Sequence, residues 1–221
     1  MTFPSRSLAV VIPTLNAAAV LAGALESLAR GRIADIVVAD GGSTDGTQAL
    51  AEAGGARVVE TSTGRGSQLR AGVAATTATQ LLVLHADSRL APSWPEVLRD
   101  DGRAGWFRLR LDDTTPAARR VEWLANWRAR RFGLPYGDQG LVLPRALYDA
   151  IGGYRDMPLM EDVDLVRRIG RHRLVELDAE VVTSARRYRQ GGYWRRPLRN
   201  LACLSLFLAG MAPERILKLY E

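Results

Sequence analysis

The sequence predicts one α/β domain, built on a mixed, mainly parallel sheet flanked by helices and followed by a C-terminal helical extension. Short apolar segments rich in β-branched residues alternate with helical segments over residues 1–90, a pattern typical of parallel strands joined by right-handed crossovers. The regular alternation of strand and helix segments ends over 91–185, and basic helical sequence follows over 186–221. A chain of 221 residues with 47% hydrophobic composition can bury a large core and is not generally disordered.

The first half is expected to hold four strands and three helices. Apolar runs predict strands at 8–12, 33–39, 56–60 and 81–88. Helices are expected at 16–30, from the end of the 36–47 stretch to about 53, and at 67–78. In the first helix Leu21, Leu25 and Leu28 share one face, which predicts burial of that face.

The second half is expected to shape a second pocket. Alternation predicts a strand at 105–111, and a basic, tryptophan-bearing helix follows at 116–132. A short strand is expected at 141–144 and a helix opens at the segment EDVDLVRRI. Two short closing strands are expected around 174–177 and 181–182.

The stretch IVVADGGSTDGT, residues 36–47, joins a buried strand to a helix. Asp40 ends the strand, and open α/β sheets bind ligands at this edge. Gly41 and the next glycine allow a tight turn and close backbone approach, and Ser43, Thr44 or Asp45 can cap the helix. Asp40 can accept hydrogen bonds from a base or a ribose; the alternative is an ordinary joint with a capping Asp.

Two further acidic sites follow. In LHADS, Asp87 ends an apolar strand beside His85 and can hold Mg²⁺ or Mn²⁺ together with ligand phosphates; alternatively it caps the next turn, and His85 is a packing residue. Glu161 and Asp162 open a helix, where the dipole stabilises their charge. Asp162 either has only that role or takes a proton from an attacking hydroxyl. We expect Asp40, Asp87 and Asp162 to converge on one cleft.

These motifs, with VVIPTLN and GRGSQLRAG, resemble those of a family 2 glycosyltransferase with the GT-A (Rossmann-like) fold, over about residues 7–175. The forms LHADS and YGDQG are similar to those of a compact bacterial subgroup. The resemblance implies inverting transfer of a sugar from a nucleoside-diphosphate donor, expected to be a UDP-sugar, with a divalent cation. No Q-x-x-R-W motif is present, so the enzyme is expected to be non-processive.

The resemblance also implies roles for matching positions. Donor binding is implied for Pro13, Thr14, Asn16, Asp40, Gly41, Arg65, His85, Asp87 and Gln139. Asp40 would contact the base and Asp87 would bind Mn²⁺ or Mg²⁺ as the second acid of D-x-D. Asp162 would be the general base, supported by Glu161, and Gln139 would lie near the sugar or acceptor.

The sequence departs from the family pattern in places. Leu15 stands where an aromatic residue is common, Gly41 replaces a second acid, and His85 replaces the first acid of D-x-D. These departures affect the expected base preference and metal affinity more than the fold.

The net charge of +6 comes almost wholly from arginine, and no acidic residue occurs between Val181 and Pro213. The apolar run 200–212 lies among these arginines and predicts either a core or homodimer helix, or an interfacial helix on anionic lipid. No run reaches the length of a membrane span, and no cleavable leader is evident. Cys203 alone excludes a disulfide framework and favours a reducing, cytoplasmic setting, with peripheral contact to the inner membrane face as an option.

A glycosyltransferase is therefore the leading hypothesis. The alternative is a non-catalytic nucleotide- or polyanion-binding module on the same fold. Nucleic-acid binding lacks any recognition motif. A dehydrogenase is disfavoured because PTLNAAA, not G-x-G-x-x-G, follows the first strand. The acceptor, a small molecule or a lipid-linked group, is not identified by the sequence.

Overall fold

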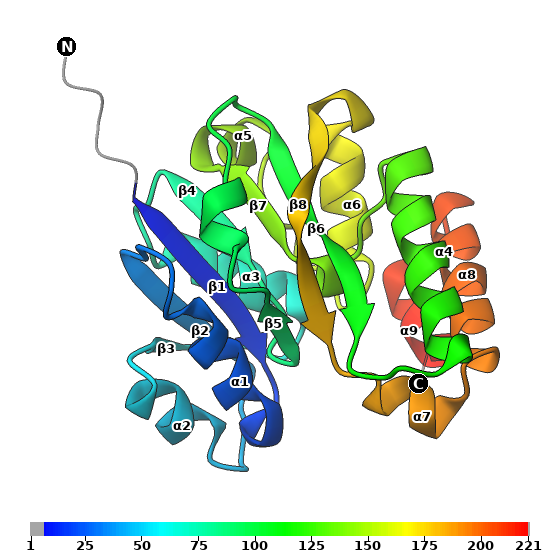
Figure 1. Ribbon diagram of the computed structural model, residues 1–221, viewed down its shortest axis with the longest axis horizontal. Coiled ribbons are helices and arrows are strands. Elements are labelled where there is room, and N and C mark those ends of the chain that lie inside the picture. Colours follow the sequence, from blue (N-terminus) through cyan, green and yellow to red (C-terminus); the bar gives the residue numbers. More distant parts are fainter. Residues whose placement is uncertain (1–6, 221) are drawn as a thin grey trace.

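The computed structural model describes residues 7–220, in which eight strands form one mixed sheet in the order β3-β2-β1-β4-β7-β6-β8-β5 (Figure 1). The strands are β1 Leu8–Thr14, β2 Asp35–Asp40, β3 Arg57–Glu60, β4 Gln80–Val83, β5 Ser88–Leu90, β6 Ala104–Leu111, β7 Leu141–Pro144 and β8 Leu174–Thr183. The helices are α1 Ala18–Leu28, α2 Thr47–Ala53, α3 Arg65–Ala74, α4 Pro116–Phe132, α5 Arg145–Ala150, α6 Glu161–Ile169, α7 Arg186–Gly191, α8 Arg195–Leu208 and α9 Pro213–Tyr220. The predicted fold class is confirmed.

The first half of the sheet is parallel. β1 lies between β2 and β4, and its register with β2 places Thr14 beside Asp40. The backbone N–H of Leu84, just past β4, donates to the carbonyl of Val11. The carboxyl ends of β1, β2 and β4 therefore lie side by side, at the edge where such sheets bind ligands.

The stretch 81–88 is not one strand, as the sequence predicted. β4 ends at Val83, the chain turns through residues 85–88, where Ser88 N–H donates to the carbonyl of His85, and β5 then pairs with β8 at the far end of the sheet order. His85 and Asp87 thus lie in a turn at the sheet edge, because the two halves of this apolar run pair with different strands.

The two closing strands expected at 174–177 and 181–182 are in fact the single strand β8. It pairs in parallel with β6 along its length, with an irregularity: Trp106 pairs with Glu176, but Arg108 pairs with Glu180. β8 therefore carries extra residues between these pairs, and a bulge of this kind interrupts the side-chain alternation from which strands are predicted.

Alternate residues of the strands feed two cores, one on each face of the sheet. One core holds Val10 and Ile12 with Leu21, Leu25 and Leu28 of α1, which confirms the predicted buried face. The other core holds Ala9 and Val11 with residues of α3, α5 and α6. The sheet is therefore the middle layer between helices, as the period of two along a strand requires.

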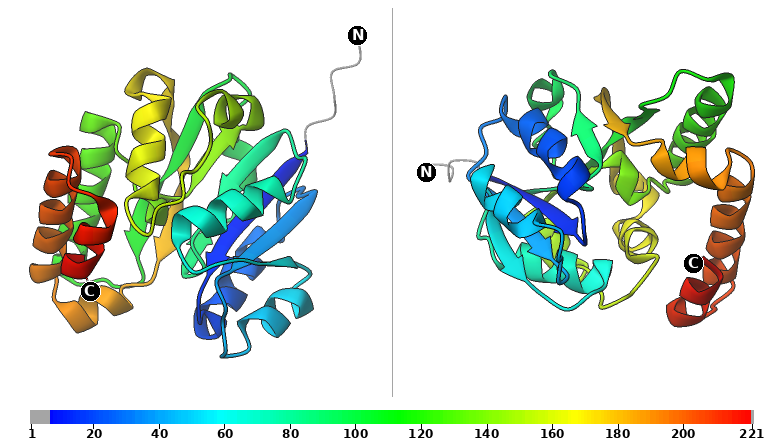
Figure 2. Two further views of the ribbon diagram at one scale, coloured as in Figure 1. Left: turned by 180° about the vertical axis from the view of Figure 1, so that it is seen from behind. Right: turned by 90° about the horizontal axis from the view of Figure 1, so that it is seen from below.

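The chain beyond β8 forms the helices α7, α8 and α9, which lie with α4 at the end of the molecule away from β2 and β3 (Figures 1 and 2). Cys203 and Leu204 of α8 and Ile216 of α9 pack on Leu159 and Met160, the residues that precede α6. Within residues 7–220 no helix has the length and hydropathy that crossing a bilayer requires.

Candidate active site

A hydrogen-bonded turn surrounds Asp40 at the ends of β1 and β2. Five donors of the chain bind its carboxylate: the hydroxyls of Thr14 and Ser43, the side-chain amide of Gln48, and the backbone N–H groups of Gly42 and Ser43. Burial alone would raise the pKa of Asp40, but the hydrogen bonds, led by those from Ser43 and Gln48, outweigh it and lower the pKa to about 2. Asp40 is therefore held as a carboxylate.

In this structure Asp40 is bound by donors of the chain itself, and its expected contact with a base stays a prediction. The side chain is 0% exposed, and its oxygens are occupied by donors of the chain itself. A carboxylate in that state organises the turn that follows β2. Asp40 also does not line the cavity described below, so two of the three acids expected to converge do so, and the third does not.

The other residues expected around the base strengthen the same turn. Asn16 has φ 51°, its side-chain Oδ1 accepts the N–H of Thr44 at 3.0 Å, and its own N–H donates to Ser43 Oγ at 2.8 Å. Asp45 accepts the N–H of Thr47, the first residue of α2. The N-cap position is Gly46, and no side chain caps this end of the helix, so the capping expected of Ser43, Thr44 or Asp45 was wrong. Pro13, Thr14 and Gly41 are buried at this edge.

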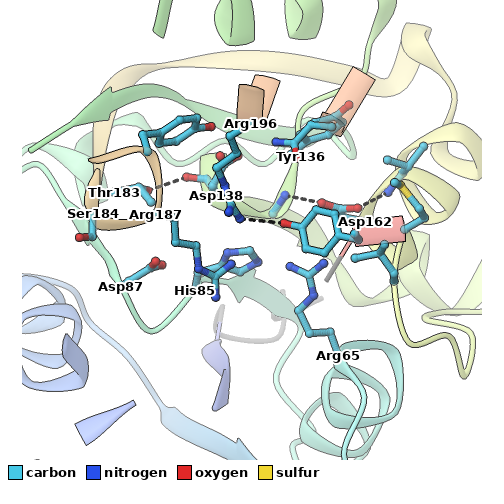
Figure 3. A pocket seen from close by; sticks show the side chains of 17 residues that line it. Arg65, His85, Asp87, Tyr136, Asp138, Asp162, Thr183, Ser184, Arg187 and Arg196 are labelled. Carbon is cyan, nitrogen blue, oxygen red and sulfur yellow. Dashed lines mark hydrogen bonds between the residues drawn. The ribbon is translucent and has the colours of Figure 1, made fainter. Parts of the chain in front are cut away.

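A cavity of about 100 Å³ lies next to this turn, between the sheet edge, the N-terminus of α6 and the C-terminal helices (Figure 3). Four of the expected site residues line it, namely Arg65, His85, Asp87 and Asp162. Seven do not line it: Pro13, Thr14, Asn16, Asp40, Gly41, Gln139 and Glu161.

Asp162 enters the cavity from the first turn of α6. Its Oδ2 accepts the backbone N–H of Gly137 and its Oδ1 accepts that of Val163, each at 2.7 Å. Both bonds fix the carboxylate, and each oxygen retains a lone pair for a further donor. The carboxylate of Asp162 is therefore held in one orientation at the start of α6.

Glu161, its neighbour, faces away from the cavity. The side chain is 1% exposed, and Oε1 lies 3.0 Å from Nε of Arg65. Burial raises the pKa of Glu161 to about 7, against the opposing effect of the Arg65 charge. Glu161 therefore holds Arg65 in place, and its expected support of Asp162 is indirect.

Asp87 lies across the cavity from Asp162, and His85 lies between them (Figure 3). Burial, aided by the charge of Arg65, lowers the pKa of His85 to about 4, so its imidazole is neutral at pH 7. His85 packs on Gly137, where any Cβ would overlap its ring. The carboxylate of Asp87 has no hydrogen-bond partner among the side chains of residues 7–220, and it therefore faces the cavity with free lone pairs.

The loop YGDQG contributes a different residue from the expected one. Gln139 is 0% exposed, and its amide bonds to Phe107, Asn126, Arg128 and Tyr136, so it ties the loop to β6 and α4. Asp138 lines the cavity instead, and burial raises its pKa to about 6. The motif pointed to this loop, but nothing in it distinguished Asp138 from Gln139.

The wall contributed by the C-terminal helices was not predicted as part of the site. Arg187, Tyr188, Arg196, Asn200 and Tyr220 line the cavity from α7, α8 and α9. The Arg196 guanidinium donates to the Tyr220 hydroxyl at 3.0 Å (Figure 3). The run of arginines after residue 185 was the available signal, but it was equally consistent with solvent or a membrane surface.

The donor set of the cavity suits a hard cation only when a ligand completes the shell. No group of three His, Cys, Asp or Glu residues within the described part of the chain could hold a metal ion alone. Asp87 offers one unoccupied carboxylate beside a neutral imidazole. Mg²⁺ commonly binds through one or two carboxylates plus substrate phosphates, without a complete protein cage, and the residues present fit that mode.

Residues 9–107 match the family model described as glycosyl transferase family 2. The matched segment carries the turn around Asp40 together with Arg65, His85 and Asp87. Asp162 and the C-terminal helices lie outside it. Among curated proteins no match to the chain was found.

Solved structures share the fold. Glucosyl-3-phosphoglycerate synthase from Mycobacterium tuberculosis, in complex with Mn²⁺, UDP and glucosyl-3-phosphoglycerate, has a TM-score of 0.56 at 23% identity, over 81% of this chain and 71% of that one. Mannosyl-3-phosphoglycerate synthase from Rubrobacter xylanophilus has a TM-score of 0.59 at 21% identity, over 93% and 75%. TarS 1–349 from S. aureus has a TM-score of 0.65 at 15% identity, over 97% and 69%. At these identities the likeness concerns the fold.

Proposed function

Because this chain belongs to the family 2 glycosyltransferases and has their GT-A fold, we propose that it transfers a sugar, with inversion, from a nucleoside-diphosphate donor to an acceptor hydroxyl. One observation carries this proposal. A single cavity has Asp162 on one side, a carboxylate held by backbone N–H groups, and Asp87 on the other, a carboxylate without a hydrogen-bond partner among residues 7–220. Arg65 lines the same cavity on the side of Asp162 (Figure 3).

In this proposal Asp162 is the general base. Displacement with inversion needs one base on the face of the sugar opposite the leaving group. The bonds from Gly137 and Val163 set the orientation of the carboxylate before substrate binds, so its remaining lone pairs can receive the acceptor proton as the new glycosidic bond forms and the bond to the diphosphate breaks.

The leaving diphosphate gains negative charge as that bond breaks. Arg65, Arg187 and Arg196 line the cavity, and guanidinium groups fixed near such oxygens stabilise the charge as it develops. Arg65 is held by Glu161 at 3.0 Å, so its position does not have to be organised during the reaction.

We further propose that Asp87, with neutral His85 beside it, holds a divalent cation whose other ligands are donor phosphates. A cation bound there would neutralise the diphosphate and so favour its departure. The structure of the mycobacterial synthase with Mn²⁺ and UDP supports Mn²⁺ and a UDP-sugar as the first candidates to test.

The cavity is small for such a donor, because pockets for ligands of this size commonly measure some ~300–1,000 Å³. Tyr220 and Arg196, bonded to each other, occupy its C-terminal side. We expect donor binding to displace this pair outward.

Thermal-shift measurement with nucleoside diphosphates and Mn²⁺ tests the proposal. UDP and Mn²⁺ together should raise the melting temperature of the wild type more than either alone, since a ligand that binds only the folded state stabilises it. Asp87→Asn should lose this synergy, and the wild type should hydrolyse or transfer the sugar of a UDP-sugar in the presence of Mn²⁺. If no nucleoside diphosphate shifts the melting temperature, the donor assignment is wrong; if one does so without any turnover of its sugars, the chain is a binding module.

A further inference from the structure

Helix α4 exposes a cluster of aromatic side chains. Trp123 is 63% exposed, and its ring stacks on Trp127 with 6.3 Å between centroids. Phe132 meets Trp127 edge-on at 5.3 Å and is itself 49% exposed. Large aromatic rings that contact one another and also face solvent form a contiguous apolar patch, which isolated exposed residues do not.

Helix α8 exposes a second apolar stripe. Trp194 just before it and Leu198, Leu201 and Leu208 within it are all exposed, between 47% and 62%. Their spacing of three, four and seven residues places them on one side of the helix. The core contacts of α8 are made by its other side, through Cys203 and its neighbours, so the outer stripe takes no part in the core.

The two patches are joined. The guanidinium carbon of Arg120, one turn before Trp123 on α4, lies 4.3 Å from the centroid of the Trp194 ring. Both helices lie at the same end of the molecule (Figures 1 and 2). We call this surface the α4–α8 face. It consists of Arg120, Trp123, Trp127 and Phe132 of α4 together with Trp194, Leu198, Leu201 and Leu208.

The segments that form this part of the molecule are rich in arginine. The arginines of α4 and of 186–208 are Arg119, Arg120, Arg128, Arg130, Arg131, Arg186, Arg187, Arg189, Arg195, Arg196 and Arg199. The only acidic residue in these segments is Glu122, which is 4% exposed and bonded to Arg110 and Arg119. Arg130 pairs with Glu176, and Arg189 with Asp112 and Asp113, while Arg187 and Arg196 line the cavity. Arg120, Arg131, Arg186 and Arg195 form no ion pair within residues 7–220, so an excess of positive charge remains. Two copies of this face would bring arginines against arginines, which disfavours a symmetric dimer through it. An anionic surface is complementary to it.

We propose that the α4–α8 face docks on the surface of an anionic lipid bilayer. Tryptophan is suited to the headgroup level, where its ring is amphipathic. Apolar helix faces bordered by arginine bind bilayers through buried apolar area and attraction to anionic lipid. This proposal does not depend on the proposed transferase activity.

Docking would also place the cavity beside the bilayer. The opposite side of α8 contributes Arg196 and Asn200 to the cavity wall, so one helix would contact lipid on one side and substrate on the other. The mouth of the site would then lie close to molecules held in the headgroup layer.

Co-sedimentation with vesicles of phosphatidylcholine, with and without phosphatidylglycerol, tests the proposal. The full chain should pellet with the anionic vesicles at low salt (about 50 mM) and be released at high salt (about 500 mM), because screening weakens the arginine contacts. The double variant Leu198→Gln/Leu201→Gln should weaken binding by about tenfold or more, and so should Arg120→Glu/Arg195→Glu. Leu15→Gln, which changes another exposed leucine outside the face, is the matched control and should bind as the wild type does.

Circular dichroism melting would verify that each variant is folded. Absence of pelleting with anionic vesicles at low salt would overturn the proposal, as would equal binding by the folded α8 double variant and the wild type. Sedimentation velocity gives a further check: a wild-type dimer that Leu198→Gln/Leu201→Gln converts to monomer would mean that the face is covered by a second copy and not by lipid.

Discussion

Nε of Arg65 lies 3.0 Å from Oε1 of Glu161, so that the first residue of α3 is paired with the first residue of α6. Glu161 is buried while Arg65 reaches the cavity. The pKa of Glu161 is nevertheless raised to about 7, chiefly by burial. The desolvation free energy of this carboxylate is therefore larger than the stabilisation from its ion pair with Arg65, as is common for buried ion pairs.

Glu161 should make stability depend on pH. Its pKa is higher in the folded chain than the ordinary 4.5, so the folded state binds the proton more tightly, and stability declines as pH rises from about 4.5 to 7. Relative to Glu161→Gln, the wild type should lose roughly 2 kcal/mol of unfolding free energy between about pH 5 and pH 8. Urea denaturation of both proteins at the two pH values measures this difference. If the unfolding free energies of the two proteins changed equally with pH, the prediction would be wrong.

Asp162→Asn tests the general base. The amide oxygen can still accept the N–H of Gly137, so the fold and donor binding should persist, but the side chain no longer accepts the acceptor proton. We expect turnover to fall by roughly 10²- to 10⁴-fold and the dissociation constant for UDP with Mn²⁺ to change little. Steady-state kinetics and calorimetry measure the two quantities.

Asp178→Asn is a matched control for that substitution, because the Asp178 side chain is 86% exposed and pairs with Arg108 on the surface. It should leave both turnover and binding near wild type. An Asp162→Asn enzyme that retains more than a few per cent of the wild-type rate would assign the base to another residue.

Asp40→Ala distinguishes a structural from a base-binding Asp40. Removal of the carboxylate leaves five donors of one turn without their acceptor, and we expect a loss of about 3 kcal/mol or more of unfolding free energy in the absence of any nucleotide. Asp35→Ala, which removes an exposed ion pair with Arg57, should cost less than about 1 kcal/mol. Unchanged stability of Asp40→Ala together with lost UDP binding would restore the base contact expected from the sequence.

Gly137→Ala tests the packing between the YGDQG loop and His85. The added Cβ overlaps the imidazole ring, so either the loop or His85 must move, at a cost of about 1–3 kcal/mol. We expect a lower melting temperature and a loss of transfer activity, because the same loop holds Asp162 through the Gly137 N–H. Gly191→Ala is the control: a Cβ at Gly191 meets nothing within 4 Å, so its melting temperature and activity should match those of the wild type. If Gly137→Ala were as stable and as active as Gly191→Ala, the close packing of Gly137 on His85 would be contradicted.

Much of the fold could be read from local pattern. The helix 116–132 has the bounds predicted for it, because a proline, an N-cap threonine and a following glycine mark its ends. Leu21, Leu25 and Leu28 are buried as their spacing required. Asp87 and Asp162 were identified as pocket residues because each follows a motif that puts it at a strand or helix end.

Other features depended on contacts between distant segments. The run 81–88 divides because Ser88 pairs with Thr183 and not with β1. The carboxylate of Asp40 is enclosed because Gln48 and Thr14, which lie far from each other in the chain, both donate to it. Gln139 is buried because Phe107 and Asn126 surround its amide.

The sequence by itself therefore determined an α/β domain with an acid at the end of a strand and another at the start of a helix, because hydrophobic period and capping act over a few residues. Only the tertiary structure decided which acids share a cavity and that α7, α8 and α9 wall it. Those relationships join residues far apart in the chain, such as Arg65 with Glu161 and His85 with Gly137, and no local pattern records them.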